Sequence, residues 1–176
     1  PISSVTCNMK TFQTELDLAI AVVKEALAAL ANFRPESADF EFDEHWPREM
    51  KASVDRLLEE IILKCLLPRG IAVLSEEAGT LNGIADDSLR WVVDPLDGTV
   101  NFIHSLPSCA VSIALCKGEE PIFGVVGEYP SGKIAWGGKS YGAFLDQKPL
   151  RISSVNDKSK AILCTGFPSR FDFSQE

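Results

Sequence analysis

The residues best suited to chemistry lie where a short apolar run, Trp91 to Val93, ends. Asp94 directly follows this run, Pro95 comes next, and Asp97 lies two residues after Pro95. Pro95 holds Asp94 extended and starts a turn with a fixed φ, so we expect Asp97 to come round beside Asp94. Two carboxylates with the backbone carbonyl of Leu96 between them are the oxygen ligands that a hard divalent cation such as Mg²⁺ prefers. The spacing therefore predicts a metal site.

The next residues could bind an anion. Gly98 and Thr99 begin a predicted short helix that runs from Thr99 to about His104. The unpaired N–H groups and the positive dipole end at a helix start favour an anion such as phosphate. The sequence thus predicts a phosphate site directly beside the metal site.

A second group of carboxylates leaves another apolar run, Ile71 to Ser75. Glu76 and Glu77 come directly after it. Alone, this pair would be read as a solvated turn. If the run is a strand that lies next to the strand ending at Asp94, Glu76 reaches a cation held by Asp94. We therefore predict that Glu76 is a third metal ligand.

Two helices are expected upstream of these groups. From Met9 to about Ala31, apolar residues recur at intervals of three or four, the period of an amphipathic helix. The segment from Arg34 to Pro47 carries five acidic residues and no helical stripe, so a long loop is expected there. A second helix is expected from an N-cap at Ser53 to about Leu67, where Pro68 ends it.

The second helix carries a pair of carboxylates. Asp55 and Glu59 are four residues apart, so they share one face of the helix and repel each other. We expect a cationic or hydrogen-bonding group to face them.

The rest of the chain reads as strands, because the apolar period changes to two after Ile71. The expected strands are Ile71 to Ser75, Leu89 to Asp94, Cys109 to Lys117, Ile122 to Tyr129, Lys133 to Gly137, Gly142 to Leu145 and Ala161 to Thr165. Most connections after Cys109 are too short for crossover helices, so neighbouring strands should pair antiparallel. We predict an α+β fold, with two long N-terminal helices packed on a mainly antiparallel sheet of about six or seven strands.

Composition limits the classes of partner. The 176 residues include 17 basic and 25 acidic side chains, for a net charge of −8, which argues against binding to nucleic acid or to an anionic membrane. No stretch approaches the ~20 apolar residues of a spanning helix, and Pro1 to Lys10 has no signal-peptide pattern. The expectation is a cytoplasmic protein without nucleic-acid or membrane partners.

Taken together, these motifs resemble a known family. Ser75-Glu76-Glu77, followed by the string Trp-Val-Val-Asp-Pro-Leu-Asp-Gly-Thr-Val-Asn-Phe that ends at Phe102, is similar to the inositol monophosphatase family of Mg²⁺-dependent, lithium-sensitive phosphatases. The similarity extends to the strand that ends near Phe144. It implies hydrolysis of a phosphate monoester of a small polyol, sugar or nucleotide, with two or three Mg²⁺ ions and a homodimeric assembly.

The resemblance implies a metal role for four residues. Glu76, Asp94 and the carbonyl of Leu96 would bind the first Mg²⁺ ion. Asp97, together with Asp94, would bind a second.

It also implies the residues of catalysis and substrate binding. Asp55, Glu76 and Thr99 are the expected catalytic residues, of which Thr99 and Asp55 would orient and deprotonate the attacking water. Asp97, Gly98 and Thr99 are the expected substrate-binding residues, with the backbone N–H groups of Gly98 and Thr99 on the phosphate.

The chain also departs from the family pattern. The family places a further metal-ligand aspartate in a Trp-Asp-x-Ala-x-Gly motif, which does not occur after Asn101, and Glu44 stands where a lysine is common. We therefore expect residues 1–176 to be one domain, the N-terminal half of such an enzyme with its C-terminal half absent, and the isolated chain could be inactive.

Two alternatives stay open. One is a non-catalytic fragment that binds metal or phosphate. The other is a phosphatase of the haloacid-dehalogenase type with Asp94 as the nucleophile. Against the second, the interval between the two aspartates is one residue longer here than in that family, and the downstream strands lack alternating helices.

Overall fold

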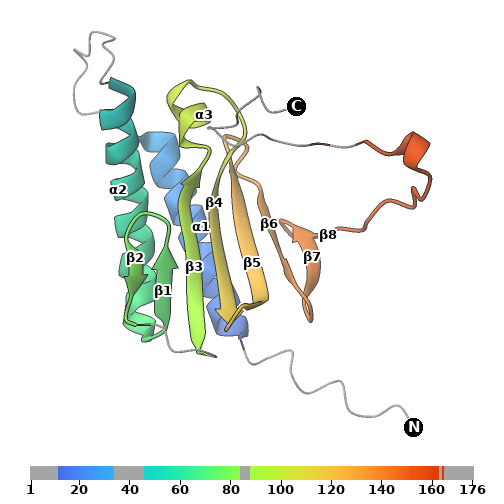
Figure 1. The fold of residues 1–176 in the computed structure, drawn as a ribbon, viewed down its shortest axis with the longest axis horizontal. Helices are drawn as coiled ribbons and strands as arrows, with labels where there is room; N and C mark the ends of the chain where they lie inside the picture. The colour runs from blue at the N-terminus through green and yellow to red at the C-terminus, as the bar shows by residue number, and fades with distance from the viewer. Residues whose placement is uncertain (1–11, 34–45, 84–87, 163, 165–176) are drawn as a thin grey trace, which may run out of the picture.

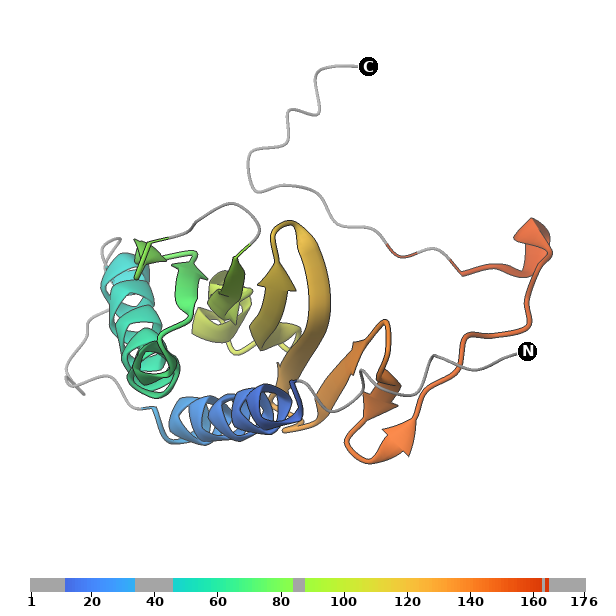
Figure 2. The same cartoon turned by 90° about the horizontal axis from the view of Figure 1, so that it is seen from below.

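The two N-terminal helices lie on one face of a single sheet of eight strands (Figures 1 and 2). The computed structural model describes residues 12–33, 46–83, 88–162 and 164. The helices are α1 (Gln13–Asn32), α2 (Trp46–Leu66) and the short α3 (Thr99–Ile103). The strands are β1 (Ala72–Ser75), β2 (Gly79–Leu81), β3 (Leu89–Asp97), β4 (Cys109–Lys117), β5 (Glu120–Tyr129), β6 (Ile134–Gly138), β7 (Gly142–Leu145) and β8 (Lys148–Pro149).

Helix α1 follows its apolar period. The side chains at intervals of three and four along it are buried: Leu16, Ala19, Val22, Val23, Ala26, Leu27 and Leu30. This stripe faces the sheet, as expected for an amphipathic helix. The expected start at Met9 lies outside the described residues.

Helix α2 begins seven residues before the expected N-cap at Ser53, so that prediction was wrong. The helix starts at Trp46, and Pro47 lies in its first turn. Proline is tolerated there because the N–H groups of the first turn have no partner within the helix. The rest of the expected loop, residues 34–45, lies outside the described residues. The C-terminal end agrees with expectation, because a 3₁₀ turn at Leu67–Arg69 leads to Gly70 at φ 70°.

The sheet has the order β2-β1-β3-β4-β5-β6-β7-β8. Only β1 and β3 pair in parallel among its neighbours, and the other pairs are antiparallel. The α+β fold with a mainly antiparallel sheet is therefore confirmed, but the strand count of six or seven was too low. The unexpected strands are β2, with three residues, and β8, with two, which are too short to show an alternating pattern.

One expected strand is not found. Ala161 and Ile162 belong to no strand, and neither does Cys164. The other residues of that prediction, 163 and 165, lie outside the described residues. Ile162 is 93% exposed, so the apolar run that suggested a buried strand has no packing partner in the described part of the chain.

The core fills the space between the helices and the sheet. Trp91 and Val93 of β3 and alternate residues of β4 point into it, as do Val54, Leu58 and Ile62 of α2. Helix α1 crosses β5 closely at Gly127, where an added Cβ would lie 2.7 Å from Leu27 Cδ1 and would also meet Val23. Among the described helices, none is both long and apolar enough to cross a membrane.

Candidate functional site

Asp94 and Asp97 are brought to the same side of the sheet by a bulge in β3. Asp94 pairs with Ser112 of β4, and Asp97 pairs with Ala110, so β3 uses one residue more than β4 over this interval. In a regular strand, residues three apart point to opposite faces, and one extra residue restores the same face. The chain at Pro95 is thus a bulged strand and not the expected turn. The bulge nevertheless brings the two carboxylates to the same side, as the turn was expected to do.

Glu76 reaches the same point from the neighbouring strand. Strands β1 and β3 run parallel, with Ser75 beside Val93, and the N–H of Glu76 donates to the carbonyl of Val93 at 3.0 Å. Because parallel strands end at the same edge of a sheet, the residues that follow them meet. The prediction that these strands are neighbours is confirmed, and the side chains of Glu76 and Asp94 are hydrogen-bonded to each other. The prediction that Glu76 reaches a cation held by Asp94 stays a prediction.

The carboxyl group of Asp94 has a raised pKa. Partial burial, the negative charges of Glu76 and Asp97, and a hydrogen bond with the Glu76 carboxylate together raise the pKa of Asp94 from 3.8 to about 6. A hydrogen bond from the N–H of Leu96 to Asp94 Oδ1, 3.1 Å long, acts in the opposite direction. The site therefore concentrates negative charge and favours a cation or a proton.

The donors fit a hard divalent cation in type, because all of them are oxygens and three carry charge. They are not arranged as a finished metal centre. Within the described ranges, no three His, Cys, Asp or Glu side chains lie close enough together to hold a metal ion. Glu76 and Asp94 are hydrogen-bonded to each other. Asp94 is half-buried, whereas Glu76 and Asp97 are both exposed.

The carbonyl of Leu96 faces the start of α3. It accepts a hydrogen bond from Thr99 Oγ1 at 3.0 Å, while the Leu96 side chain is buried. A carbonyl oxygen has two lone pairs, so one is left for a further contact. Thr99 is thereby held beside the bulge that carries the aspartates.

Gly98 is required where it stands, between β3 and α3. Its φ is 81°, and an added Cβ would lie 2.7 Å from the carbonyl oxygen of Ser108. Asn101 Nδ2 donates to that same oxygen at 2.8 Å, which fastens the loop after α3 to the helix. The close approach of this loop and the positive φ together explain why a glycine stands at the start of α3.

Asp55 lies on α2, which contacts both α3 and β3. Its side chain is only 6% exposed, which is unusual for an aspartate. The structure therefore brings the helix of Asp55 against the helix of Thr99. The roles of all these residues stay predictions.

The sequence alone did not indicate a role for Glu59. The expected hydrogen-bonding partner exists, because Glu59 Oε1 accepts from Ser75 Oγ at 2.6 Å and from the N–H of Ala78 at 2.9 Å. The four-residue spacing from Asp55 was the available signal, but it did not show which segment would supply the donors.

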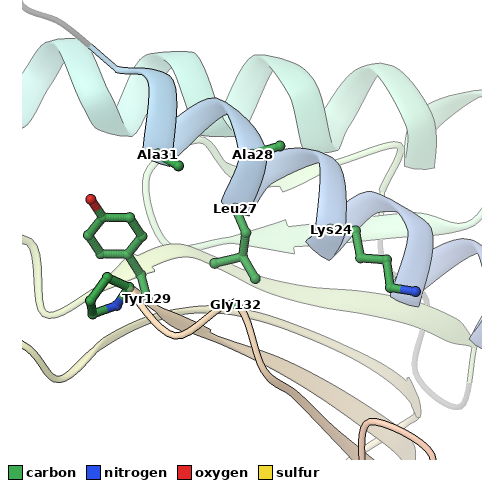
Figure 3. Close-up of a pocket in the computed structure, with 7 residues that line it drawn as sticks. Lys24, Leu27, Ala28, Ala31, Tyr129 and Gly132 are labelled. Carbon is green, nitrogen blue, oxygen red and sulfur yellow. The ribbon is translucent and has the colours of Figure 1, made fainter.

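A pocket lies apart from these carboxylates, between α1 and the turn after β5 (Figure 3). Its lining residues are Lys24, Leu27, Ala28, Ala31, Tyr129, Pro130 and Gly132. The ring of Tyr129 also meets that of Phe102 in α3, at 5.5 Å between centroids. The pocket is mainly apolar, and none of the predicted site residues lines it.

Comparisons of this chain with known proteins agree with one another. A model of the inositol monophosphatase family matches residues 12–173. The fructose-1,6-bisphosphatase/inositol-1-monophosphatase of Aquifex aeolicus is 39% identical over 120 residues, which cover 68% of this chain and 44% of that protein. The inositol-1-monophosphatase of Caulobacter vibrioides is 33% identical over 153 residues, or 85% of this chain and 59% of that protein.

The fold has counterparts among solved structures. The inositol monophosphatase from Anabaena superposes with a TM-score of 0.70 at 27% identity, over 83% of this chain and 52% of that one. The chain spans about half the length of the curated relatives it matches. The match over residues 12–173 shows that the chain belongs to the inositol monophosphatase family.

Proposed function

We propose that this chain carries the metal-binding and phosphate-binding residues of a Mg²⁺-dependent phosphomonoesterase. The substrate class is a phosphate monoester of a small polyol, sugar or nucleotide. The observation that carries the proposal is the contact of Glu76 with Asp94, with the pKa of Asp94 at about 6, beside the start of α3. Relatives named as inositol-1-monophosphatase and fructose-1,6-bisphosphatase support this class of substrate.

Glu76, Asp94 and the carbonyl of Leu96 would hold one Mg²⁺ ion, and Asp94 with Asp97 would contribute to a second. When bound, Mg²⁺ neutralises charge on the phosphate and makes a bound water more acidic. The crowded carboxylates suit this role, because a cation would offset the two effects that raise the pKa of Asp94, its partial burial and the negative charges of Glu76 and Asp97.

The residues around α3 would bind and orient the reactants. The N–H groups of Gly98 and Thr99, at the start of α3, would donate to the phosphate oxygens, as N–H groups without a helical partner commonly do. The Thr99 hydroxyl donates to the carbonyl of Leu96, which leaves its oxygen able to accept from a water and so orient it. Asp55 on the adjoining helix is the proposed acceptor of the proton that this water loses.

Calorimetry with Mg²⁺ or Mn²⁺ tests the site. Asp94→Asn removes a charged ligand shared by both proposed ions and should abolish binding. Glu119→Gln, an exposed carboxylate in the turn between β4 and β5, is the control and should bind as the parent does. Equal affinities in the two variants would refute the metal assignment.

Phosphate release tests the reaction itself. In a protein that joins this chain to the C-terminal half of a family relative, we expect inorganic phosphate to be released from inositol 1-phosphate or fructose 1,6-bisphosphate only when Mg²⁺ is present. A rapid-quench experiment should find no phosphate bonded to the protein, since water is the proposed nucleophile. A phosphorylated Asp94 would instead support chemistry of the haloacid-dehalogenase type.

A further inference from the structure

Glu59 holds the turn that presents Glu76, although it belongs to a different element. The residue lies on α2, and its Oε1 accepts two hydrogen bonds from the segment between β1 and β2. One comes from Ser75 Oγ at 2.6 Å and the other from the N–H of Ala78 at 2.9 Å. The two donors stand on either side of Glu76 and Glu77 in the sequence. Glu59 therefore ties both ends of this short segment to the helix.

The turn itself is tight. Ser75, the last residue of β1, pairs with Gly79, the first of β2, so only Glu76 to Ala78 lie between the strands. The N–H of Glu76 donates to the carbonyl of Val93 in β3 at 3.0 Å. The backbone around Glu76 is thus fastened on one side by the sheet and on the other by the Glu59 carboxylate.

The contact between Ser75 and Glu59 has the character of a strong hydrogen bond. Its length of 2.6 Å lies in the range of hydroxyl groups that donate to ionised carboxylates, which are about twice as strong as neutral pairs. Ser75 is only 2% exposed, so water competes little for its hydroxyl. A buried, charge-assisted contact of this kind restricts where the turn can sit.

We propose that Glu59 is a positioning residue for Glu76. By fixing the turn from Ser75 to Ala78, it keeps the Glu76 carboxylate against Asp94, and so prepares the pair to receive a divalent cation. Glu59 acts through the backbone of the turn and does not touch the cation or the substrate. This inference rests on the proposed function, because it assumes that Glu76 and Asp94 share a cation.

The variants separate the hydrogen bonds from the charge and from the bulk of the side chain. Glu59→Leu removes the acceptor at similar size, whereas Glu59→Gln loses the charge but keeps an oxygen that can accept both bonds. Ser75→Ala removes a single donor. Glu60→Leu, an exposed neighbour on the same helix, is the matched control.

Two measurements are made on the full 176-residue chain. Calorimetry with Mg²⁺ alone gives the affinity, and NMR hydrogen exchange follows the amide of Ala78. We expect Glu59→Leu to weaken Mg²⁺ binding by about 10-fold or more, in line with the loss of other groups that hold a metal ligand in place. Ala78 should exchange faster in the same variant. Ser75→Ala should weaken binding less, Glu59→Gln should restore most of the affinity, and Glu60→Leu should match the parent.

The outcomes separate this inference from the proposed function. If Asp94→Asn leaves Mg²⁺ binding unchanged, the proposed function fails, and the role of Glu59 fails with it. If Asp94→Asn abolishes binding but Glu59→Leu and Ser75→Ala bind as the parent does, only the positioning role is refuted. If circular dichroism shows that Glu59→Leu does not fold, the test rests on Ser75→Ala and Glu59→Gln. An affinity of Ser75→Ala for Mg²⁺ equal to that of the parent would then refute the inference.

Discussion

Partial burial and the negative charges of Glu76 and Asp97 make the ionised form of Asp94 unfavourable in the folded chain. Its pKa is raised to about 6, so the folded chain holds a proton there over a pH range in which the unfolded chain has lost it. A raised carboxyl pKa therefore makes the free energy of unfolding fall as the pH rises from about 4 to about 6. Above pH 6, the cost of the charge is present in full.

Asp94→Asn should consequently stabilise the metal-free chain at neutral pH. Because Asp94 is partly exposed, solvent screening limits the gain to about 1 kcal/mol. That gain corresponds to roughly 2–4 °C in Tm for a chain of this size. Thermal melts in a chelator at pH 7.5 and pH 4 test this, and the gain should vanish at pH 4. An equal gain at both pH values would show that the charge on Asp94 is not its source.

In a protein that joins this chain to the C-terminal half of a family relative, Thr99 and Asp55 should affect the rate more than substrate binding. Thr99→Ala removes the hydroxyl that would orient the water, and Asp55→Asn removes the proposed proton acceptor. Either change should lower kcat by about 10² or more, with little change in KM. Steady-state kinetics of phosphate release give both constants. A rise in KM at constant kcat would place these residues in substrate binding instead.

The crossing of α1 over β5 depends on the absence of a side chain at Gly127. An added Cβ there would lie 2.7 Å from Leu27 Cδ1, inside the packed core. Gly127→Ala should therefore lower the free energy of unfolding by about 1–3 kcal/mol, as overpacking typically does. Gly124→Ala on the same strand is the control, because nothing lies within 4 Å of its added Cβ. Equal urea midpoints for the two variants would contradict the close approach.

Elements with a strong periodic pattern could be predicted from the sequence. Strand β4 was predicted with the bounds that the structure has, because its alternate residues Val111, Ile113 and Leu115 are buried. The very short β2 and β8 carry no such signal, since their pairing depends on the strand beside them. The early start of α2 was missed because Pro47 reads as a helix boundary although the first helical turn accepts it.

The candidate site, like the fold, could be predicted from the sequence only in part. The proximity of Asp94 and Glu76 could be predicted, because each follows a recognisable apolar run, and that of Asp97 could be predicted from the change of direction at Pro95. The means of grouping the two aspartates could not, since a bulge and a turn at Pro95 have the same sequence signature. The bonds from Ser75 and Ala78 to Glu59 join residues 16 and 19 positions apart, and no local pattern reports such contacts.

At the scale of the whole molecule, the segment after β8 runs away from the sheet (Figure 2), and its apolar side chains are exposed. Leu150, Ile152, Val155 and Ile162 are 49%, 97%, 50% and 93% exposed. Exposed apolar groups favour association. We therefore expect dimers or larger species at high protein concentration. Light scattering should show a lower mean mass for the double variant Ile152→Lys, Ile162→Lys than for the parent. A parent chain that stays monomeric at all concentrations would contradict this expectation.

The order of the strands also bears on how the chain folds during its synthesis. Neighbours in the sheet are neighbours in the sequence except that β1 lies between β2 and β3. Contacts between nearby segments form quickly, because little loop entropy is lost. Both long helices leave the ribosome before the eight described strands, at roughly 5–20 residues per second. Each new strand can then add to an edge that already exists, so β1 and β3 can bring Glu76 beside Asp94 before β5 leaves the ribosome.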